Sequence, residues 1–301
     1  MENTFYREFE LFLQSNGIEF IRKENIFIVK KNNFSICLVA IGEEEDTQGY
    51  NIFLYQDVWN RNKDIAQQRI LANLGIFQKI FARKCDIISG RNNEKVRGEI
   101  NKFLEKYHSY GDAKCKYKYA MYYNNRIVAV AGFSHGREMP RNINNSFEYL
   151  PKGLNPNLKE CKFAEYEKIK DNIVMFKSFE WVRYTSLPNI RVIGGMGKFL
   201  KHFIKDILDE FLYINHYEIM SYSDNEWGSG NVYKTLNFKY IGKRTAVEYC
   251  IDKTTNKRVD KKYIPNYSKN NYYTIKNQGS AKYLLQFIRT PHCSSLYSIL
   301  T

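Results

Sequence analysis

The sequence predicts a mixed α/β protein, in which helical and extended segments alternate. Apolar residues recur at helical spacing over residues 3–14 and 199–208, and short runs rich in β-branched and aromatic residues lie between such segments. Only 17 Gly and 6 Pro occur in 301 residues, which excludes a low-complexity or fibrous chain. This length suits one large domain or two modest ones.

The first domain, a small α/β unit, is expected over residues 1–92. Its first helix ends at Asn16-Gly17, which is a helix C-cap signal. Polar turns separate the apolar runs that follow, which favours strands. The expected elements are helices at 3–14 and 62–74 and strands at 18–21, 26–29, 34–41 and 51–55.

The second domain is expected over residues 93–250. A helix at 96–106 precedes a hairpin of strands at 117–123 and 126–133, because Asn124-Asn125 accepts the positive φ that a type I′ turn needs. The polar segment 134–171 is expected to be an irregular surface loop. The remaining expected elements are a strand at 173–184, a glycine turn at 191–198, a helix at 199–208, a strand at 217–222, a short helix at 229–236 and a strand at 238–241.

The glycine turn is the most informative segment, since it follows a strand and opens a helix. The first amides of a helix have no partner within it, and with the positive helix end they can hold phosphate oxygens. The spacing fits neither a P-loop nor a dinucleotide-binding fingerprint. The alternative is a tight strand-to-helix turn without a ligand.

The charge balance predicts attraction to polyanions. Lys and Arg number 46 and Asp and Glu 32, giving a net charge of +14. Residues 251–301 form a third segment, a basic and tyrosine-rich extension in which Lys and Arg could neutralise phosphates and rings could stack on bases. Two plainer explanations exist: a Lys- and Asn-rich composition from an AT-biased genome, and a terminal hairpin of residues 271–275 and 282–288.

Several classes of protein are not expected. No apolar run approaches the roughly 20 residues that cross a bilayer, and the start of the chain lacks the features of a secretion signal, so a cytoplasmic protein is expected. The six cysteines are spread singly, which predicts neither a metal site nor disulfides. The five histidines stand at no recognisable triad spacing.

The order of elements over residues 96–250 resembles the GNAT acyltransferase superfamily. Arg191-Val-Ile-Gly194-Gly195-Met-Gly197 stands at the position of that family's cofactor loop. Counted from Arg191, Met196 takes the last small-residue position; counted back from Gly195 and Gly197, Val192 takes the position of the family's Arg or Gln. Asn225, Tyr233 and Leu236-Asn237-Phe238 stand at its second motif, with Asn237 in place of a glycine. The resemblance implies an N-acyltransferase that uses acetyl-CoA or a related acyl-CoA.

The same resemblance implies a set of site residues. Tyr233 would protonate the leaving thiolate, and Asp224 or Glu226 would accept a proton from the amine. The residues implied to bind the cofactor are Arg191, Val192, Ile193, Gly194, Gly195, Met196, Gly197, Lys198 and Asn225.

A narrower resemblance is to phage and mobile-element proteins that join a Vsr-like or homing-endonuclease-like segment to a GNAT-like, Mom-like domain. It is carried by short motifs in order between residues 50 and 240, among them Phe53-Leu-Tyr-Gln-Asp-Val-Trp59 and Ile80-Phe-Ala-Arg-Lys-Cys85. Metal-dependent cleavage needs paired carboxylates, yet the strand at 34–41 has none, and Glu43, Glu44, Glu45 and Asp46 follow it in a turn. The first domain is therefore expected to be a degenerate, inactive endonuclease remnant.

The leading functional hypothesis is thus an acyltransferase that acts on or near DNA. One alternative is a non-catalytic nucleic-acid-binding protein whose nuclease and transferase sites have decayed. Another is an acetyltransferase for proteins or small molecules whose charge is incidental. The sequence does not indicate the acceptor, the acyl group or the oligomeric state.

Overall fold

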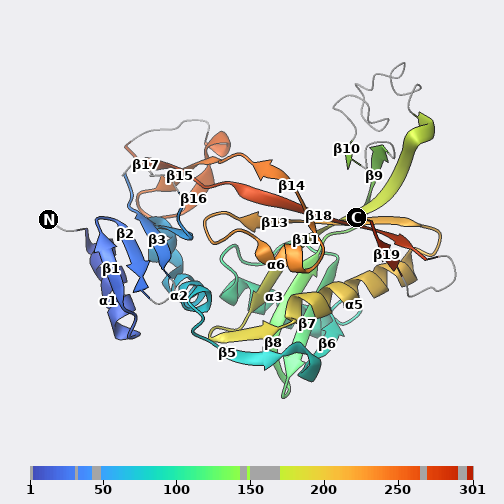
Figure 1. Cartoon of the computed structure of the whole chain (residues 1–301), viewed down its shortest axis with the longest axis horizontal. Coiled ribbons are helices and arrows are strands. Elements are labelled where there is room, and N and C mark those ends of the chain that lie inside the picture. Colours follow the sequence, from blue (N-terminus) through green and yellow to red (C-terminus); the bar gives the residue numbers. More distant parts are fainter. Residues whose placement is uncertain are drawn as a thin grey trace.

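The computed structural model describes residues 3–30, 33–42, 49–142, 148–149, 170–264, 270–290 and 297–300. The chain is a mixed α/β protein, as the sequence predicts (Figure 1). No helix in these ranges is long and apolar enough to cross a membrane.

The first unit is a four-stranded sheet with two helices on one face. The strands, in spatial order, are β1 (Phe20–Lys23), β2 (Ile26–Val29), β3 (Phe34–Val39) and β4 (Ile52–Tyr55). Helices α1 (Thr4–Ser15) and α2 (Gln56–Asn73) bury Phe9 and Trp59 against this sheet. The Asn3 side chain caps α1 by accepting a hydrogen bond from the Phe5 amide at 3.0 Å.

The other face of this sheet packs against a second, three-stranded sheet. Its strands, in spatial order, are β16 (Arg258–Asp260), β15 (Glu248–Asp252) and β17 (Tyr272–Lys276). Val39 and Phe53 from the first sheet meet Ile251 and Ile275 from the second in one apolar cluster. Segments about 200 residues apart in the sequence therefore share a core.

The largest sheet has the order β14-β18-β13-β11-β8-β7-β6. These strands are β6 (Asp86–Ser89), β7 (Tyr117–Tyr123), β8 (Arg126–Phe133), β11 (Ile173–Ser186), β13 (His216–Asp224), β14 (Lys239–Arg244) and β18 (Ser280–Arg289). Off this path lie β9 (Arg137–Asn142), β10 (Glu148–Tyr149) and β19 (Tyr297–Ile299). The connecting helices are α3 (Glu94–Tyr107), α5 (Gly195–Glu210) and α6 (Asn231–Thr235).

Alternate residues of β7 show that α3 and α5 cover opposite faces of this sheet. The Tyr119 hydroxyl donates to Asp206 of α5 at 2.8 Å, whereas Lys118 donates to Asn101 of α3 at 2.7 Å. Successive side chains of a strand point to opposite faces. The core beneath α5 is aromatic, with the rings of Phe133 and Phe203 stacked 3.9 Å apart.

A two-stranded ribbon connects the first unit to the largest sheet. Strand β5 (Gln78–Phe81) pairs in parallel with β12 (Ile190–Ile193), which directly precedes α5. The short helix η2 (Ala82–Lys84) follows β5 and leads into β6. Residues expected to close the first domain therefore reach the glycine turn.

Most predicted elements are confirmed. Asn124 and Asn125 adopt φ of 48° and 60°, as the predicted hairpin turn requires. Residues 137–142 differ, because they form β9, paired with β11, where a loop was expected. Much of that expected loop, with Pro151 and Pro156, lies outside the described residues, as do Glu43 to Asp46.

The end of the chain also differs from the hairpin alternative. Strand β17 pairs with β15, whereas β18 lies between β13 and β14 in the largest sheet. The two strands thus belong to different sheets.

The division of the chain into domains at residues 92 and 250 stays a prediction. Strand pairing crosses both positions, since β5 pairs with β12 and β18 pairs with β13 and β14.

Candidate functional site

The candidate site lies where two parallel strands separate. Strands β11 and β13 pair from Lys177 with Tyr217 to Glu180 with Met220. Beyond this point β11 pairs only with β8, after a register shift between Trp181 and Arg183, and β13 pairs only with β18. The facing edges of residues 181–186 and 221–224 form no strand pairs with each other, and we call the gap between them the slot.

Three polar groups meet where the slot begins. The Ser221 hydroxyl donates to the Trp181 carbonyl at 3.0 Å, and its oxygen lies 2.8 Å from the Tyr233 hydroxyl. Tyr233 comes from α6, where its ring stacks on Tyr283 with centroids 5.0 Å apart. Burial raises the pKa of Tyr233, so its hydroxyl keeps its proton at neutral pH.

The predicted glycine turn begins α5 as expected. Gly194 is the N-cap residue at φ 77°, a left-handed conformation that glycine adopts without strain. A Cβ atom at Gly195 would lie 3.1 Å from the Val192 Cβ and 3.3 Å from the Tyr184 hydroxyl. The amides of the first turn, at residues 195–197, have no acceptor within the helix.

Strand β5 and helix η2 hold this turn from outside. The Lys198 ammonium donates to the carbonyl of Ala82 at 3.1 Å and to that of Cys85. The charge of Lys198 is therefore directed toward backbone oxygens of η2 and of the residue that follows it. Arg191 lies over the Phe77 ring, with its guanidinium carbon 5.3 Å from the centroid.

The remaining predicted loop residues divide into buried and exposed groups. Val192 is buried in the core, Gly195 is buried at the start of α5, and Met196 packs partly against the same core. Ile193 is 38% exposed. Asn225 lies apart from them, since its side-chain amide donates to the Gln278 carbonyl at 3.0 Å.

Asp224 faces the opposite side of the sheet from Ser221. The two are three residues apart on β13, so their side chains alternate to opposite faces. One Asp224 oxygen accepts from the Tyr110 hydroxyl at 3.0 Å, in the loop after α3, and the other accepts from the Glu226 amide. Burial, followed by the charges of Asp224 and Glu226, raises the pKa of Tyr110, so it remains a donor.

Glu226 is buried in an ion-pair network. Arg258 pairs with Asp57 at 2.6 Å and with Glu226 at 3.1 Å, and both carboxylates are at most 3% exposed. One guanidinium thus serves two buried carboxylates. Burial raises the pKa of Glu226 to about 7 despite the opposing effect of Arg258.

The first unit contributes further groups beside Asp224. The Arg69 guanidinium stacks over the Trp227 ring, 4.1 Å from its centroid, and donates to the Ser109 hydroxyl at 3.3 Å.

His108, at the end of α3, lies near the same arginine. Burial, with the nearby Arg183 and Arg69, lowers the pKa of His108 to about 3. His108 is therefore neutral at pH 7 and too weakly basic to accept a proton there.

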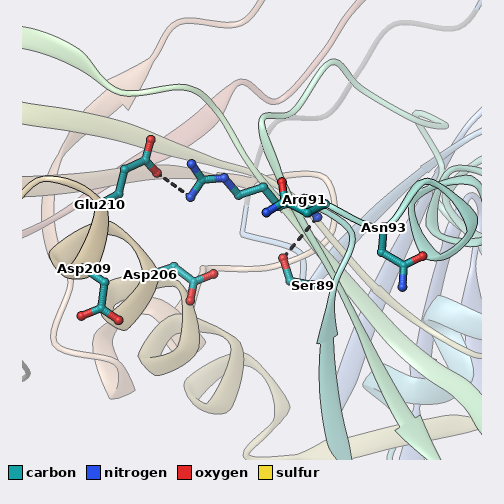
Figure 2. Close-up of a pocket in the computed structure, with 7 residues that line it drawn as sticks. Ser89, Arg91, Asn93, Asp206, Asp209 and Glu210 are labelled. Carbon is teal, nitrogen blue, oxygen red and sulfur yellow. Dashed lines mark hydrogen bonds and ion pairs between the residues drawn. The ribbon is translucent and has the colours of Figure 1, made fainter.

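A polar pocket of about 510 Å³ lies at the other end of α5 (Figure 2). Figure 2 shows Arg91 pointing to Glu210, at 2.8 Å. Glu210 also accepts from Tyr117, and Asp206 accepts from Tyr119. These carboxylates connect α5 to the sheet through hydrogen bonds.

In the described part of the chain, no group of His, Cys, Asp and Glu is arranged to hold a metal ion.

Sequence reasoning missed several residues of this site. The sequence assigned no role to Ser221 or Tyr110, and only the fold brings them to Tyr233 and Asp224. Asp57 and Arg258 are separated by 201 positions. Asp57 stands in the motif at residues 53–59, which carries no sign of its pairing with Arg258.

Comparison with known proteins returns acetyltransferase structures. A GNAT family acetyltransferase from Elizabethkingia anophelis with acetyl-CoA bound is 12% identical, with a TM-score of 0.32 over 67% of this chain and 97% of that chain. A polyamine N-acetyltransferase from Drosophila melanogaster is 9% identical, with a TM-score of 0.32 over 66% and 99%. A Bacillus subtilis acetyltransferase in complex with CoA is 10% identical, with a TM-score of 0.28 over 67% and 97%. No family model and no curated protein matches the sequence.

Stability should depend on pH through Glu226. The pKa of Glu226 in the folded protein, about 7, exceeds its ordinary value of 4.5. The contribution of Glu226 to the free energy of unfolding is therefore fully present below about pH 4.5 and is lost as pH rises through about 7. We expect denaturant titrations to show wild type losing stability relative to Glu226→Gln between about pH 5 and pH 8. Parallel pH profiles for the two proteins would contradict this assignment. Glu248→Gln, at an exposed ion pair, is the control.

Proposed function

We propose that the chain is a GNAT-like N-acyltransferase that uses acetyl-CoA or a related acyl-CoA. The observation that carries the proposal is the slot between β11 and β13, which has the Tyr233 hydroxyl where it begins. The glycine-initiated helix α5 follows β12, the strand after β11. The order of hairpin, strand, glycine turn, helix and parallel strand is the order that the sequence resemblance implies.

The residues at the start of α5 fit a phosphate-bearing cofactor. Gly195 leaves room where a Cβ would crowd Val192 and Tyr184, and the amides of residues 195–197 are available as donors at the positive end of a helix of 16 residues. When bound, the cofactor supplies the acyl group as an activated thioester.

Tyr233 and Asp224 divide the acid and base roles between the two faces of the sheet. Tyr233 holds a proton at a buried hydroxyl on the α5 face, positioned by Ser221. With the thioester bound, this hydroxyl would be the proton donor to the sulfur. Asp224, on the α3 face, accepts a proton from an amine directly or through water. Glu226 is less suited to this role, because it is 2% exposed and paired with Arg258.

Cofactor binding should depend on Gly195. In Gly195→Glu, the Cβ crowds Val192 and the carboxylate repels phosphate, so we expect the Kd for acetyl-CoA to rise at least about tenfold in calorimetry. Gly98→Glu is the matched control, since a Cβ at Gly98 on α3 meets nothing within 4 Å. Equal binding by wild type and Gly195→Glu would remove the glycine turn from the cofactor site.

Turnover should depend on the Tyr233 hydroxyl. We expect Tyr233→Phe to lower kcat by about 10²-fold or more while leaving acetyl-CoA affinity unchanged, because only proton donation is lost. The assay follows release of free thiol from acetyl-CoA in the presence of a panel of primary amines. Tyr240→Phe, at an exposed ring on β14, is the control. An unchanged kcat would exclude Tyr233 as the acid.

We also propose that the acceptor lies on or near DNA. Supporting this are the net charge of +14 and exposed tyrosines beside lysines in the last segment. Tyr263 and Tyr273 are 70% and 38% exposed, and the ammonium groups of Lys262 and Lys253 lie within 5 Å of their ring centroids. Such pairs can contact phosphates and stack on bases.

DNA binding should weaken steeply with salt. We expect the logarithm of affinity for a labelled DNA to fall linearly with the logarithm of salt concentration, and Lys253→Ala to reduce the slope by about 0.9 if Lys253 contacts one phosphate. Lys95→Ala, on α3, is the control. Cofactor binding without DNA binding would favour a small-molecule or protein acceptor. DNA binding without cofactor binding would favour a non-catalytic DNA-binding protein.

We retain the interpretation of the first unit as an inactive, phage-type endonuclease remnant as a proposal. It is supported by β3, whose residues Phe34–Val39 include no carboxylate. Cytoplasmic localisation likewise stays a prediction from the sequence. Two residues of this unit contact the surroundings of the transferase-like site: Asp57 pairs with Arg258, and Arg69 stacks over Trp227.

A further inference from the structure

The ribbon of β5 and β12 has a solvent-exposed face on which Arg191 and Ile193, two residues implied by the sequence resemblance to bind the cofactor, stand beside residues of β5 that it does not include. Side chains alternate along each strand, so Lys79 and Phe81 share one face of β5, and Arg191 and Ile193 share the same face of β12. Ile193 stands opposite Phe81 in the strand register. This face is continuous in sequence with Gly194, the residue that starts α5.

Two large apolar side chains on this face are exposed. Phe81 is 43% exposed and Ile193 is 38% exposed, and both lie next to the glycine turn. Val192, an apolar residue on the other face of β12, is only 4% exposed. Neighbouring exposed side chains such as Phe81 and Ile193, beside a proposed ligand site, offer an apolar surface on which a flat ring can pack.

The same face is surrounded by positive charge. The Arg83 guanidinium lies 5.2 Å from the Phe81 ring centroid, and Arg191 and Lys79 are exposed. Residues 77–85 and 189–198 contain no Asp or Glu. An aromatic ring with adjacent guanidinium groups is complementary to a base that carries phosphates.

We propose that Phe81, Arg83, Arg191 and Ile193 form a subsite for the adenosine 3′,5′-bisphosphate end of the acyl-CoA cofactor. This rests on the proposed function. The adenine ring packs on the exposed parts of Phe81 and Ile193, while Arg83 and Arg191 contact phosphate oxygens. A segment that precedes the acyltransferase-like hairpin thereby supplies part of the cofactor site.

The size and place of the face favour this ligand over a nucleic acid strand. A four-residue strand spans about 13 Å, which accommodates one nucleotide. The face also leads directly to the amides of residues 195–197, so a diphosphate bound there would place an attached adenosine beside Ile193. The exposed tyrosines assigned to DNA lie elsewhere: Tyr273 is on β17 and Tyr263 is in the short helix that follows β16.

The test measures affinities of Phe81→Ala for two ligands by calorimetry, CoA and adenosine 3′,5′-bisphosphate. We expect both to bind about five- to tenfold more weakly than to wild type, since a base–ring contact is lost. Phe81→Trp should retain affinity. Phe81 is exposed, so neither substitution removes core packing. Ile88→Ala, at a 40% exposed residue of β6, is the matched control and should bind as wild type does.

The outcomes separate this inference from the proposed function. If CoA binds wild type and Phe81→Ala equally, the subsite is overturned while the acyltransferase proposal stands. If Ile88→Ala weakens CoA as much as Phe81→Ala does, the effect is not specific to the face and the subsite is overturned. If wild type binds no CoA, the proposed function fails and the subsite fails with it.

Discussion

The arrangement of the candidate site depends on the ion pairs of Arg258. One buried guanidinium joins Asp57, at the start of α2, to Glu226, in the loop after β13. Removing one partner from such a network leaves an unpaired buried charge, which costs several kcal/mol, of the order of 3–5. The Phe53 amide donates to the Glu226 carbonyl and reinforces the same junction. The three sheets therefore meet at one point, directly beside Asp224.

This junction explains how residues from three different sheets can form one site. Glu226 is held in place, so its amide fixes one oxygen of Asp224, while Tyr110 fixes the other. On the opposite face, Ser221 positions Tyr233 at the start of the slot. Each polar group that the proposed chemistry uses is thus oriented by a neighbour that is itself packed or paired. Such supporting contacts are what a precise site requires.

The sequence predicted local features well because local physics determines them. The Asn16-Gly17 end of the first helix, the Asn124-Asn125 turn and Gly194 each impose a conformation on their own segment. It could not predict the pairing of β5 with β12 or of Arg258 with Asp57, because no local pattern encodes which distant segments meet. The strand β9 was missed for a related reason: it contains Pro140 and charged residues, and its pairing with β11 is long-range.

The position of β18 has a consequence for how the chain is made. This strand fills the space between β13 and β14, yet it comes at residues 280–289. During synthesis, β13 is complete for more than 50 residues before its partner leaves the ribosome. Until then this edge of β13 presents unpaired N–H and C=O groups, which invites association with other chains. The nascent protein should therefore need a chaperone, or rapid completion, more than a protein whose sheet is assembled in chain order.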